Sequence, residues 1–216
     1  MSIPGNIKKR AQNGKGNRAG HYVNSRQYYE KHTHGHITSR HKGGETMEFK
    51  EVVKNRYSCK KYSDAKVEAE KLEAILAAGR LAPTAKNLQE QHIYVLQSEE
   101  MLAKIDALTP CRYNAPVVLV VAFDKNNVFT YPGDKRDSGV EDATIVATHM
   151  ILAAEDEGVD SCWVNFFDPE KAAEALGLPE NEEVLMLMDL GYAAEGAGPL
   201  ANHDSRKPLS ETVTYL

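Results

Sequence analysis

Two short basic segments, far apart in the chain, carry side chains suited to holding a phosphate. The first is Arg56-Tyr57-Ser58-Cys59-Lys60, and the second is Arg206-Lys207-Pro208. A phosphate with nearly two negative charges needs cations together with hydroxyl or backbone donors. Alternate side chains of an extended segment point the same way, so Arg56, Ser58 and Lys60 can face one ligand. The alternative is that each segment is an ordinary solvated basic stretch.

A third segment, Pro83-Thr84-Ala85-Lys86-Asn87-Leu88-Gln89, is polar and stands before the apolar run His92 to Leu96. Taken alone, it is a helix C-terminus followed by a polar loop. Taken together and in this order, the three segments resemble the FMN-dependent nitroreductase family. The resemblance extends from about Met47 to Leu216.

The resemblance implies a role for each segment. Arg56, Ser58 and Lys60 match the family's Arg-x-Ser-x-Arg/Lys motif, which places Arg56 and Ser58 at the phosphate and Lys60 at the flavin N1/O2 edge. Thr84 replaces the Ser of a Pro-Ser-x-x-Asn-x-Gln motif. Residues 161–168 match a strand that passes the flavin, with a backbone N–H of Asn165 or Phe166 directed at N5. The implied cofactor-binding residues are Arg56, Tyr57, Ser58, Lys60, Pro83, Thr84, Asn87, Gln89, Trp163, Val164, Asn165, Phe166, Arg206 and Lys207.

Two positions depart from the family pattern. Glu90-Gln91 stands where the family usually has Pro-Trp after the glutamine, which affects the shape of the loop. Asp204 stands where another basic residue is frequent. Phosphate binding is therefore expected to rest on Arg56, Arg206 and Lys207.

The resemblance implies an enzyme that passes hydride from NAD(P)H through FMN to a small electron-poor acceptor, such as a nitroaromatic or a quinone, by a ping-pong scheme. The catalytic group would be the flavin itself, and no side chain is assigned a catalytic role. Lys60 would only tune the flavin at its N1/O2 edge. Three alternatives stay open. The chain could be a flavoprotein of this fold with dehydrogenase, oxidase, dehalogenase or flavin-modifying chemistry. It could be a non-catalytic flavin-binding protein, as Glu90 and Asp204 suggest. It could also bind nucleic acid through its first residues.

The elements that position these segments follow from hydrophobic periodicity. Helices are expected up to about Asn55 and over 68–82, 98–108, 138–158 and 168–176, and strands over 92–97, 116–123, 161–166, 183–192 and 212–216. The side chains of the 68–82 helix expected to point largely inward are Leu72, Ile75, Leu76, Gly79 and Leu81. Their irregular alternation predicts an α+β fold. The resemblance makes it a three-layer sandwich with a mixed, mostly antiparallel sheet flanked by helices. Val117 to Val121 are apolar at every position, which predicts cover on both faces of the sheet.

The expected helix over 138–158 is apolar on most faces, so it lies in a core or against a partner. A homodimer with FMN at the interface is the partner expected. Glu141 and Asp142 stand near its start, where the helix dipole favours acids. Gly133 and Gly139 bracket a polar loop that could cover the substrate.

Composition divides the chain at about residue 46. Residues 1–46 hold nine Lys/Arg and two Asp/Glu, a net charge of +7, so the net charge of −5 leaves −12 on the other 170 residues. An acidic body does not suit nucleic-acid binding. Residues 1–46 are expected to be a disordered basic extension outside the FMN-binding domain of residues 47–216, because few of them are aliphatic. The alternatives are a basic arm that binds a partner and, at His32 to His36, a weak metal site; metal binding is not expected.

The chain also carries features that bear on its location. Cys59, Cys111 and Cys162 are widely spaced and odd in number, which is typical of reduced thiols in a cytoplasmic protein. No apolar stretch has the length needed to span a bilayer, and no signal-peptide core follows the N-terminal charges. A cytoplasmic protein without a membrane partner is therefore expected.

Overall fold

The computed structural model describes residues 48–216. The predicted basic extension over 1–46 and the cluster His32 to His36 lie outside the described residues.

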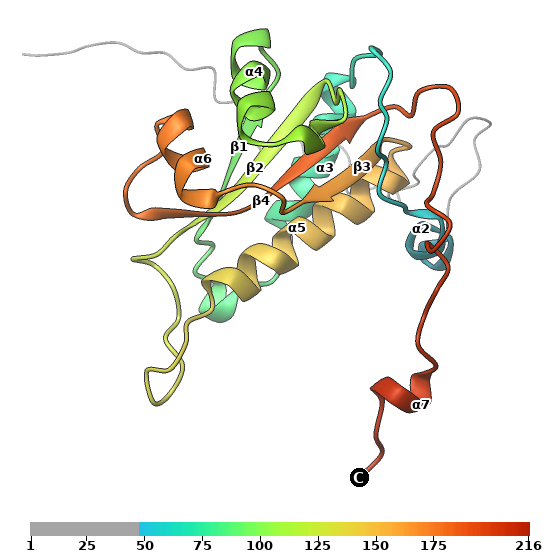
Figure 1. The fold of residues 1–216 in the computed structure, drawn as a ribbon. Helices are drawn as coiled ribbons and strands as arrows, with labels where there is room; N and C mark the ends of the chain where they lie inside the picture. Colours follow the sequence, from blue (N-terminus) through green and yellow to red (C-terminus); the bar gives the residue numbers. More distant parts are fainter. Residues whose placement is uncertain (1–47) are drawn as a thin grey trace, which may run out of the picture. The chain divides into compact units, whose positions relative to one another are not determined.

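The elements follow the predicted order, and their ends differ from the predicted ends by no more than two residues, except at the C-terminus (Figure 1). The α-helices are α2 (Phe49–Asn55), α3 (Ala69–Arg80), α4 (Glu99–Leu108), α5 (Gly139–Asp156), α6 (Pro169–Leu176) and α7 (Leu209–Thr212). The 3-10 helices are η1 (Ala85–Asn87) and η2 (Pro110–Arg112). The strands are β1 (Gln91–Leu96), β2 (Val117–Asp124), β3 (Asp160–Val164) and β4 (Glu182–Gly191).

Local signals explain why several of these helices begin and end where they do. The Asp168 carboxylate accepts the backbone N–H groups of Glu170 and Lys171 at 3.1 and 3.2 Å, and Pro169 occupies the first helical position of α6. Gly177 ends α6 with a φ of 68°, a left-handed conformation that glycine adopts without strain. The Ser98 side chain caps α4 in the same way as Asp168 caps α6.

The sheet has the order β1-β2-β4-β3, and every neighbouring pair of strands is antiparallel. One isolated parallel bridge joins Ser58 to Ser161 at the outer side of β3. The strands of the sheet are thus all antiparallel, with parallel pairing among the described residues only at this bridge, which agrees with the mostly antiparallel sheet predicted.

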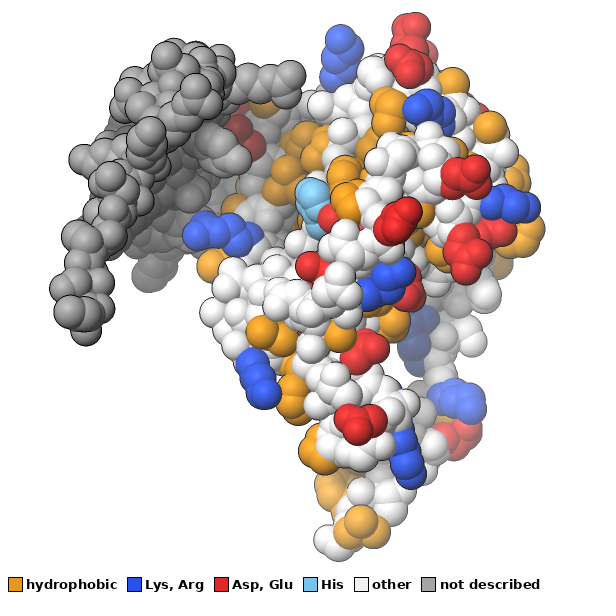
Figure 2. Space-filling view, turned by 90° about the vertical axis from the view of Figure 1, so that its left-hand side faces the viewer, with side chains coloured by type: hydrophobic (Ala, Val, Ile, Leu, Met, Phe, Trp, Pro, Cys, Tyr) orange, Lys and Arg blue, Asp and Glu red, His pale blue; other side chains and the backbone are white. Residues whose placement is uncertain are grey.

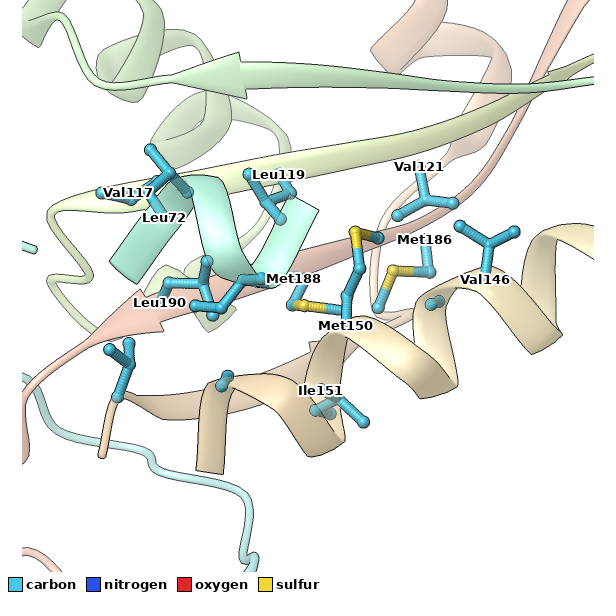
Figure 3. Close-up of a cluster of buried hydrophobic side chains, with 14 of the residues drawn as sticks. Leu72, Val117, Leu119, Val121, Val146, Met150, Ile151, Met186, Met188 and Leu190 are labelled. Carbon is cyan, nitrogen blue, oxygen red and sulfur yellow. The ribbon is translucent and has the colours of Figure 1, made fainter. Parts of the chain in front are cut away.

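Helices cover both faces of the sheet, which confirms the three-layer α+β prediction (Figure 1). Val117, Leu119 and Val121 of β2 face α3 and α5, while Val118 and Val120 face α4 and α6. Figure 3 shows the first of these cores, in which side chains from four elements meet between the sheet and the helices: Leu72 of α3, Val146, Met150 and Ile151 of α5, Val121 of β2 and Met186, Met188 and Leu190 of β4. The uninterrupted apolar run of β2 therefore reflects burial on both sides.

The structure contradicts two expectations. Residues 212–216 do not form a strand: the α7 turn ends at Thr212, and residues 204–216 are all exposed with no strand beside them in the described part of the chain. A strand needs a neighbour to accept its backbone hydrogen bonds, and none is present within the described part of this chain. Leu81, expected to point inward, is exposed because α3 ends at Arg80 and Leu81 lies at its cap.

Candidate functional site

A cavity of about 410 Å³ brings together two of the predicted segments. Ser58 and Lys60 lie on one side of it, and Trp163, Val164, Asn165 and Phe166 form another wall. The remaining lining residues are Cys111, Tyr113, Cys162, Leu200, Asn202 and His203. The cavity volume falls within the range of small-molecule sites.

The sheet edge holds the first segment in place. The backbone N–H of Cys59 donates to the Ser161 carbonyl at 2.9 Å, next to the parallel bridge between Ser58 and Ser161. The Cys59 side chain is fully buried against Tyr62 and Ala115, so the side chains of Ser58 and Lys60 are directed to the opposite side. The alternation expected from sequence therefore presents a hydroxyl and an ammonium group to the cavity.

The second wall is fixed by a hydrogen bond between its own residues. The Trp163 indole N–H donates to the Asn165 side-chain oxygen at 2.8 Å. Trp163 also packs partly against the core, whereas Phe166 is exposed beside the cavity. The wall thus combines a rigid aromatic base with a rim that is open to a ligand.

Tyr113 is a lining residue that sequence reasoning missed. Its φ is 53°, a left-handed conformation that is uncommon for a residue with a side chain. The Lys60 ammonium lies 6.0 Å from the centroid of its ring. The only sequence signal was its place just after Pro110, before the buried run of β2.

Arg56, Tyr57, Arg206 and Lys207 do not line this cavity. Arg56 caps α2 and is half-buried. The Arg206 guanidinium donates to the carbonyls of His203 and Ser205, the second at 2.8 Å, and only His203 reaches the cavity. Lys207 is exposed, with its ammonium 4.0 Å from the Glu211 carboxylate. Within one chain, the cations expected at a phosphate are therefore not gathered around the cavity.

The predicted segment from Pro83 to Gln89 also lies outside the cavity, beside the start of α5. The Asp142 carboxylate accepts the Ala85 backbone N–H at 3.0 Å, and the Thr84 hydroxyl accepts the Gln89 backbone N–H at 3.0 Å. Asn87 and Gln89 are exposed. The loop is thus well defined, but its amides do not meet Lys60 within the same chain.

The polar loop that precedes α5 forms contacts of its own rather than contacts with the cavity. A bridge joins Thr130 to Asp137, and the Glu141 carboxylate accepts the Tyr131 hydroxyl and pairs with Arg136 at 3.2 Å. Neither Glu141 nor this loop lines the cavity of its own chain. The idea that the loop covers a substrate stays a prediction.

Asp189 is a second residue that sequence reasoning missed. Its exposed fraction is 0%, and neither carboxyl oxygen has a hydrogen-bond partner among the described residues. Burial raises its pKa to about 9, against the opposing effect of the Arg112 cation. It pairs across the sheet with Cys162, which lines the cavity. The sequence signal that could have identified Asp189 is an acidic residue within the otherwise apolar run of β4.

Other kinds of site receive no support from the described part of the chain. No group of three or more His, Cys, Asp or Glu side chains there is arranged to hold a metal ion. None of its helices has both the length and the apolar character needed to cross a membrane. Figure 2 shows acidic and basic side chains interspersed over the described part of one face, rather than the continuous positive area that a nucleic acid requires.

Comparisons with known proteins agree on one family. The model of the Nitroreductase family matches residues 53–113 and 106–192. A nitroreductase family protein from Clostridium difficile 630, known from its crystal structure, is 39% identical, with a TM-score of 0.73 over 78% of this chain and 98% of its own.

Two further relatives are informative. A protein of Archaeoglobus fulgidus, provisionally named NADH dehydrogenase/NAD(P)H nitroreductase, is 34% identical over 148 residues, which are 65% of this chain and 83% of that protein. A structure from Exiguobacterium sibiricum in complex with FMN is 22% identical, with a TM-score of 0.68 over 79% of this chain and 98% of its own. At that identity the likeness concerns the fold alone.

Asp189 yields a prediction about stability and pH. Its folded pKa lies above the unfolded value of about 3.9, so the folded chain binds the extra proton between these values. The free energy of unfolding should then fall as pH rises through this window, by at most about 1.4 kcal/mol per pH unit. Asp189→Asn should remove this contribution to the pH dependence of the free energy of unfolding. Urea unfolding at a series of pH values measures it.

The exposed Asp134 provides the matched control, because Asp134→Asn removes the same charge from the surface. Its pH profile should follow that of the unaltered chain. Identical pH profiles for Asp189→Asn and the unaltered chain would show that Asp189 titrates normally.

Proposed function

Because the chain belongs to the nitroreductase family, we propose that it is an FMN-dependent oxidoreductase that uses NAD(P)H to reduce a small electron-poor acceptor, such as a nitroaromatic or a quinone. The observation that carries this proposal is the cavity in which Ser58 and Lys60 face the wall from Trp163 to Phe166. FMN held there would supply hydride-transfer chemistry between NAD(P)H and the acceptor, and both substrates would use the cavity in turn.

The residues around the cavity suit a flavin. Lys60 supplies a positive charge for the N1/O2 edge, where negative charge develops on reduction. Ser58 supplies a hydroxyl group, and the backbone N–H of Asn165 or Phe166 supplies a donor for N5. The bond between Trp163 and Asn165 holds that wall in position. These groups bind and orient, and none of them needs to act as a nucleophile.

The rest of the proposed site comes from outside the cavity. Arg56, Arg206 and Lys207 are proposed for the phosphate, and Thr84, Asn87 and Gln89 for the ribityl chain and its surroundings. Since none of these lines the cavity of its own chain, we propose that a second copy completes the site. FMN would then lie at the interface of a homodimer.

Exposed apolar side chains support such an interface. On α2, Phe49 is 71% exposed, and Val140 and Ile145 of α5 are also exposed. Beyond Pro208 the chain carries four large apolar side chains, and the exposed fraction of Tyr215 is 94%. A protein that stays monomeric seldom leaves so many large apolar groups in water.

Residues 47–216 would form the FMN-binding domain, with 1–46 outside it. A cytoplasmic location is in keeping with the three free thiols.

The direct test begins with the visible spectrum of the purified full chain. After incubation with FMN and removal of the unbound part, the protein should keep a flavin spectrum. Anaerobic NADH or NADPH should bleach it, and a nitroaromatic or quinone should restore it. A protein that stays colourless would refute FMN binding. Retained FMN that neither nicotinamide bleaches would refute the reductase activity and support other flavin chemistry.

Lys60→Ala separates tuning of the flavin from binding. Loss of one charge-assisted interaction of about 1.5–3 kcal/mol should slow bleaching by NAD(P)H by a factor of about 10 to 160. The FMN dissociation constant should change less, because Lys60 acts most strongly on the reduced form. Stopped-flow bleaching and FMN titration measure the two effects. Lys125→Ala, at an exposed lysine in the turn after β2, is the control. Equal effects on rate and affinity would count against Lys60 at N1/O2.

The dimer proposal predicts the effect of a charge on α5. Ile145→Asp should convert a species of twice the chain mass into one of a single chain mass, because a carboxylate cannot be buried there without a partner. FMN retention should fall with it if two copies share the site. Light scattering after size-exclusion chromatography measures the mass. Val95→Asp puts the same charge on an exposed valine of β1 and should leave the mass unchanged. A monomeric unaltered chain would contradict the proposal.

A further inference from the structure

Glu90 is a buried carboxyl group at the base of the loop formed by residues 84–89, and the proposed function does not use it. Its exposed fraction is 4%, the same as that of Asp142 in the first turn of α5. The Ser138 hydroxyl donates to one Glu90 carboxyl oxygen at 3.3 Å. One oxygen of Asp142 accepts the Ala85 N–H. The second oxygens of Glu90 and Asp142 are buried and have no hydrogen-bond partner within residues 48–216.

Ser138 lies between the two acids, because its hydroxyl donates to Glu90 and its carbonyl accepts the Asp142 backbone N–H at 2.8 Å. Two buried carboxyl groups so close to each other cannot both be ionised at low cost, because like charges repel strongly away from water. The N-terminal end of α5 and the Ala85 N–H both favour the negative charge on Asp142. The proton therefore resides on Glu90. Burial, followed by the hydrogen bond and the charge of Asp142, raises the pKa of Glu90 to about 7, while the Ser138 hydroxyl acts in the opposite direction.

The other charged groups nearby are engaged elsewhere. The Lys86 ammonium lies over the Phe129 ring, 4.6 Å from its centroid. The Asp124 carboxylate accepts the Asn181 amide, although its backbone N–H donates to the Glu90 carbonyl. The Asp137 carboxylate accepts the Gly139 N–H. Glu141, further round α5, pairs with Arg136. Asp142 is thus the charged side chain that decides the state of Glu90.

The loop that this pair supports is strained. Lys86, Asn87 and Gln89 have φ values of 52°, 55° and 55°, which side chains seldom adopt. Such a conformation persists only where surrounding bonds enforce it. One of these is the bond from the Ala85 N–H to Asp142, and another is the bond from the Asn127 amide to the Leu88 carbonyl at 3.1 Å. Asp142 can therefore hold the loop only while its own position beside Glu90 is stable.

We propose that Glu90 and Asp142 are positioning residues that share one proton and act as a latch for residues 84–89. While Glu90 keeps its proton, it donates to Asp142, and Asp142 holds Ala85. When Glu90 loses its proton, two buried negative charges separate and the loop opens. The latch concerns the FMN site only insofar as the proposed function is right in placing Thr84, Asn87 and Gln89 there.

Amide hydrogen exchange tests the latch without any cofactor. The full chain and Glu90→Gln are compared at about pH 6 and about pH 8.5, and the peptide that covers residues 84–90 is followed by mass spectrometry. The side-chain amide introduced by this substitution donates to Asp142 at either pH. The ratio of loop opening in the unaltered chain to that in the variant should therefore rise about tenfold between the two pH values, the effect of one pKa unit. The intrinsic rate of base-catalysed amide exchange is the same in both chains, so it cancels in this ratio. The effect of Asp189 titration is also common to both chains and cancels.

A second variant guards against misfolding of the first. Asp142→Asn keeps an oxygen for Ala85 and adds a donor toward Glu90, so it should also abolish the pH dependence of loop opening. Glu100→Gln removes an exposed carboxylate from α4 and should behave like the unaltered chain. The comparison is repeated for Glu90→Gln and Asp142→Asn. If the ratio of loop opening in the unaltered chain to that in the variant is the same at both pH values for both variants, the latch is overturned.

FMN titration at the same pH values tests the link to the site. If FMN binds only the closed loop, its apparent dissociation constant scales with one plus the open-to-closed ratio of the loop. The ratio of the FMN dissociation constants of the unaltered chain and Glu90→Gln should therefore rise with pH by the amount that the measured loop opening gives, up to about tenfold. The phosphate group of FMN titrates with a pKa of about 6, but this effect is common to both chains and cancels. A constant ratio with a pH-dependent loop would overturn the link to FMN. Absence of FMN binding would refute the proposed function, and the exchange experiment would still decide the latch.

Discussion

The pairing of β2 with β4 is the interaction on which the rest of the structure depends. Both strands are buried along most of their length, and their side chains supply the centre of two cores. Helices α3 and α5 pack on one face and α4 and α6 on the other, so the hydrophobic effect fixes all four helices through these two strands. β3 pairs with the outer side of β4, and its own free side accepts the segment with Ser58 and Lys60. The cavity therefore exists because the central pair leaves one edge strand to hold it.

Much of this arrangement could be predicted from sequence because burial leaves a periodic signal. The uninterrupted apolar residues from Val117 to Val121 indicated a strand covered on both faces. The apolar surface of α5 indicated a helix with more than one neighbour. Its Val140 and Ile145 are exposed in the single chain. The last residues carry a similar apolar pattern, but a strand also requires a partner for its backbone. That requirement cannot be read from residues 212–216 alone, so the strand expected there was wrong.

The candidate site was only partly predictable, for a related reason. Short motifs name residue types, and the resemblance to a family put Ser58, Lys60 and the 163–166 segment into one list with Arg56, Asn87 and Arg206. The fold separates that list into residues that line the cavity and residues that do not. The interpretation of the acidic residues used only their neighbours in the sequence. The helix dipole explained Asp142, and Glu90 was a departure from the family motif. Their burial beside each other depends on tertiary packing, which neither local rule contains.

The backbone contacts behind the cavity also constrain when a ligand can first be held during synthesis. The Lys61 ammonium group donates to the Glu195 carbonyl, 134 residues further along the chain, and the Ser63 hydroxyl donates to the Tyr192 carbonyl across 129 residues. Contacts of such sequence separation cannot form until the later partner has left the ribosome, and they close late because long loops are costly to order. The segment with Ser58 and Lys60 is made early and must wait for nearly the whole domain before it is anchored. Until residues 192–195 have emerged, the nascent chain therefore lacks the contacts that anchor this side of the cavity.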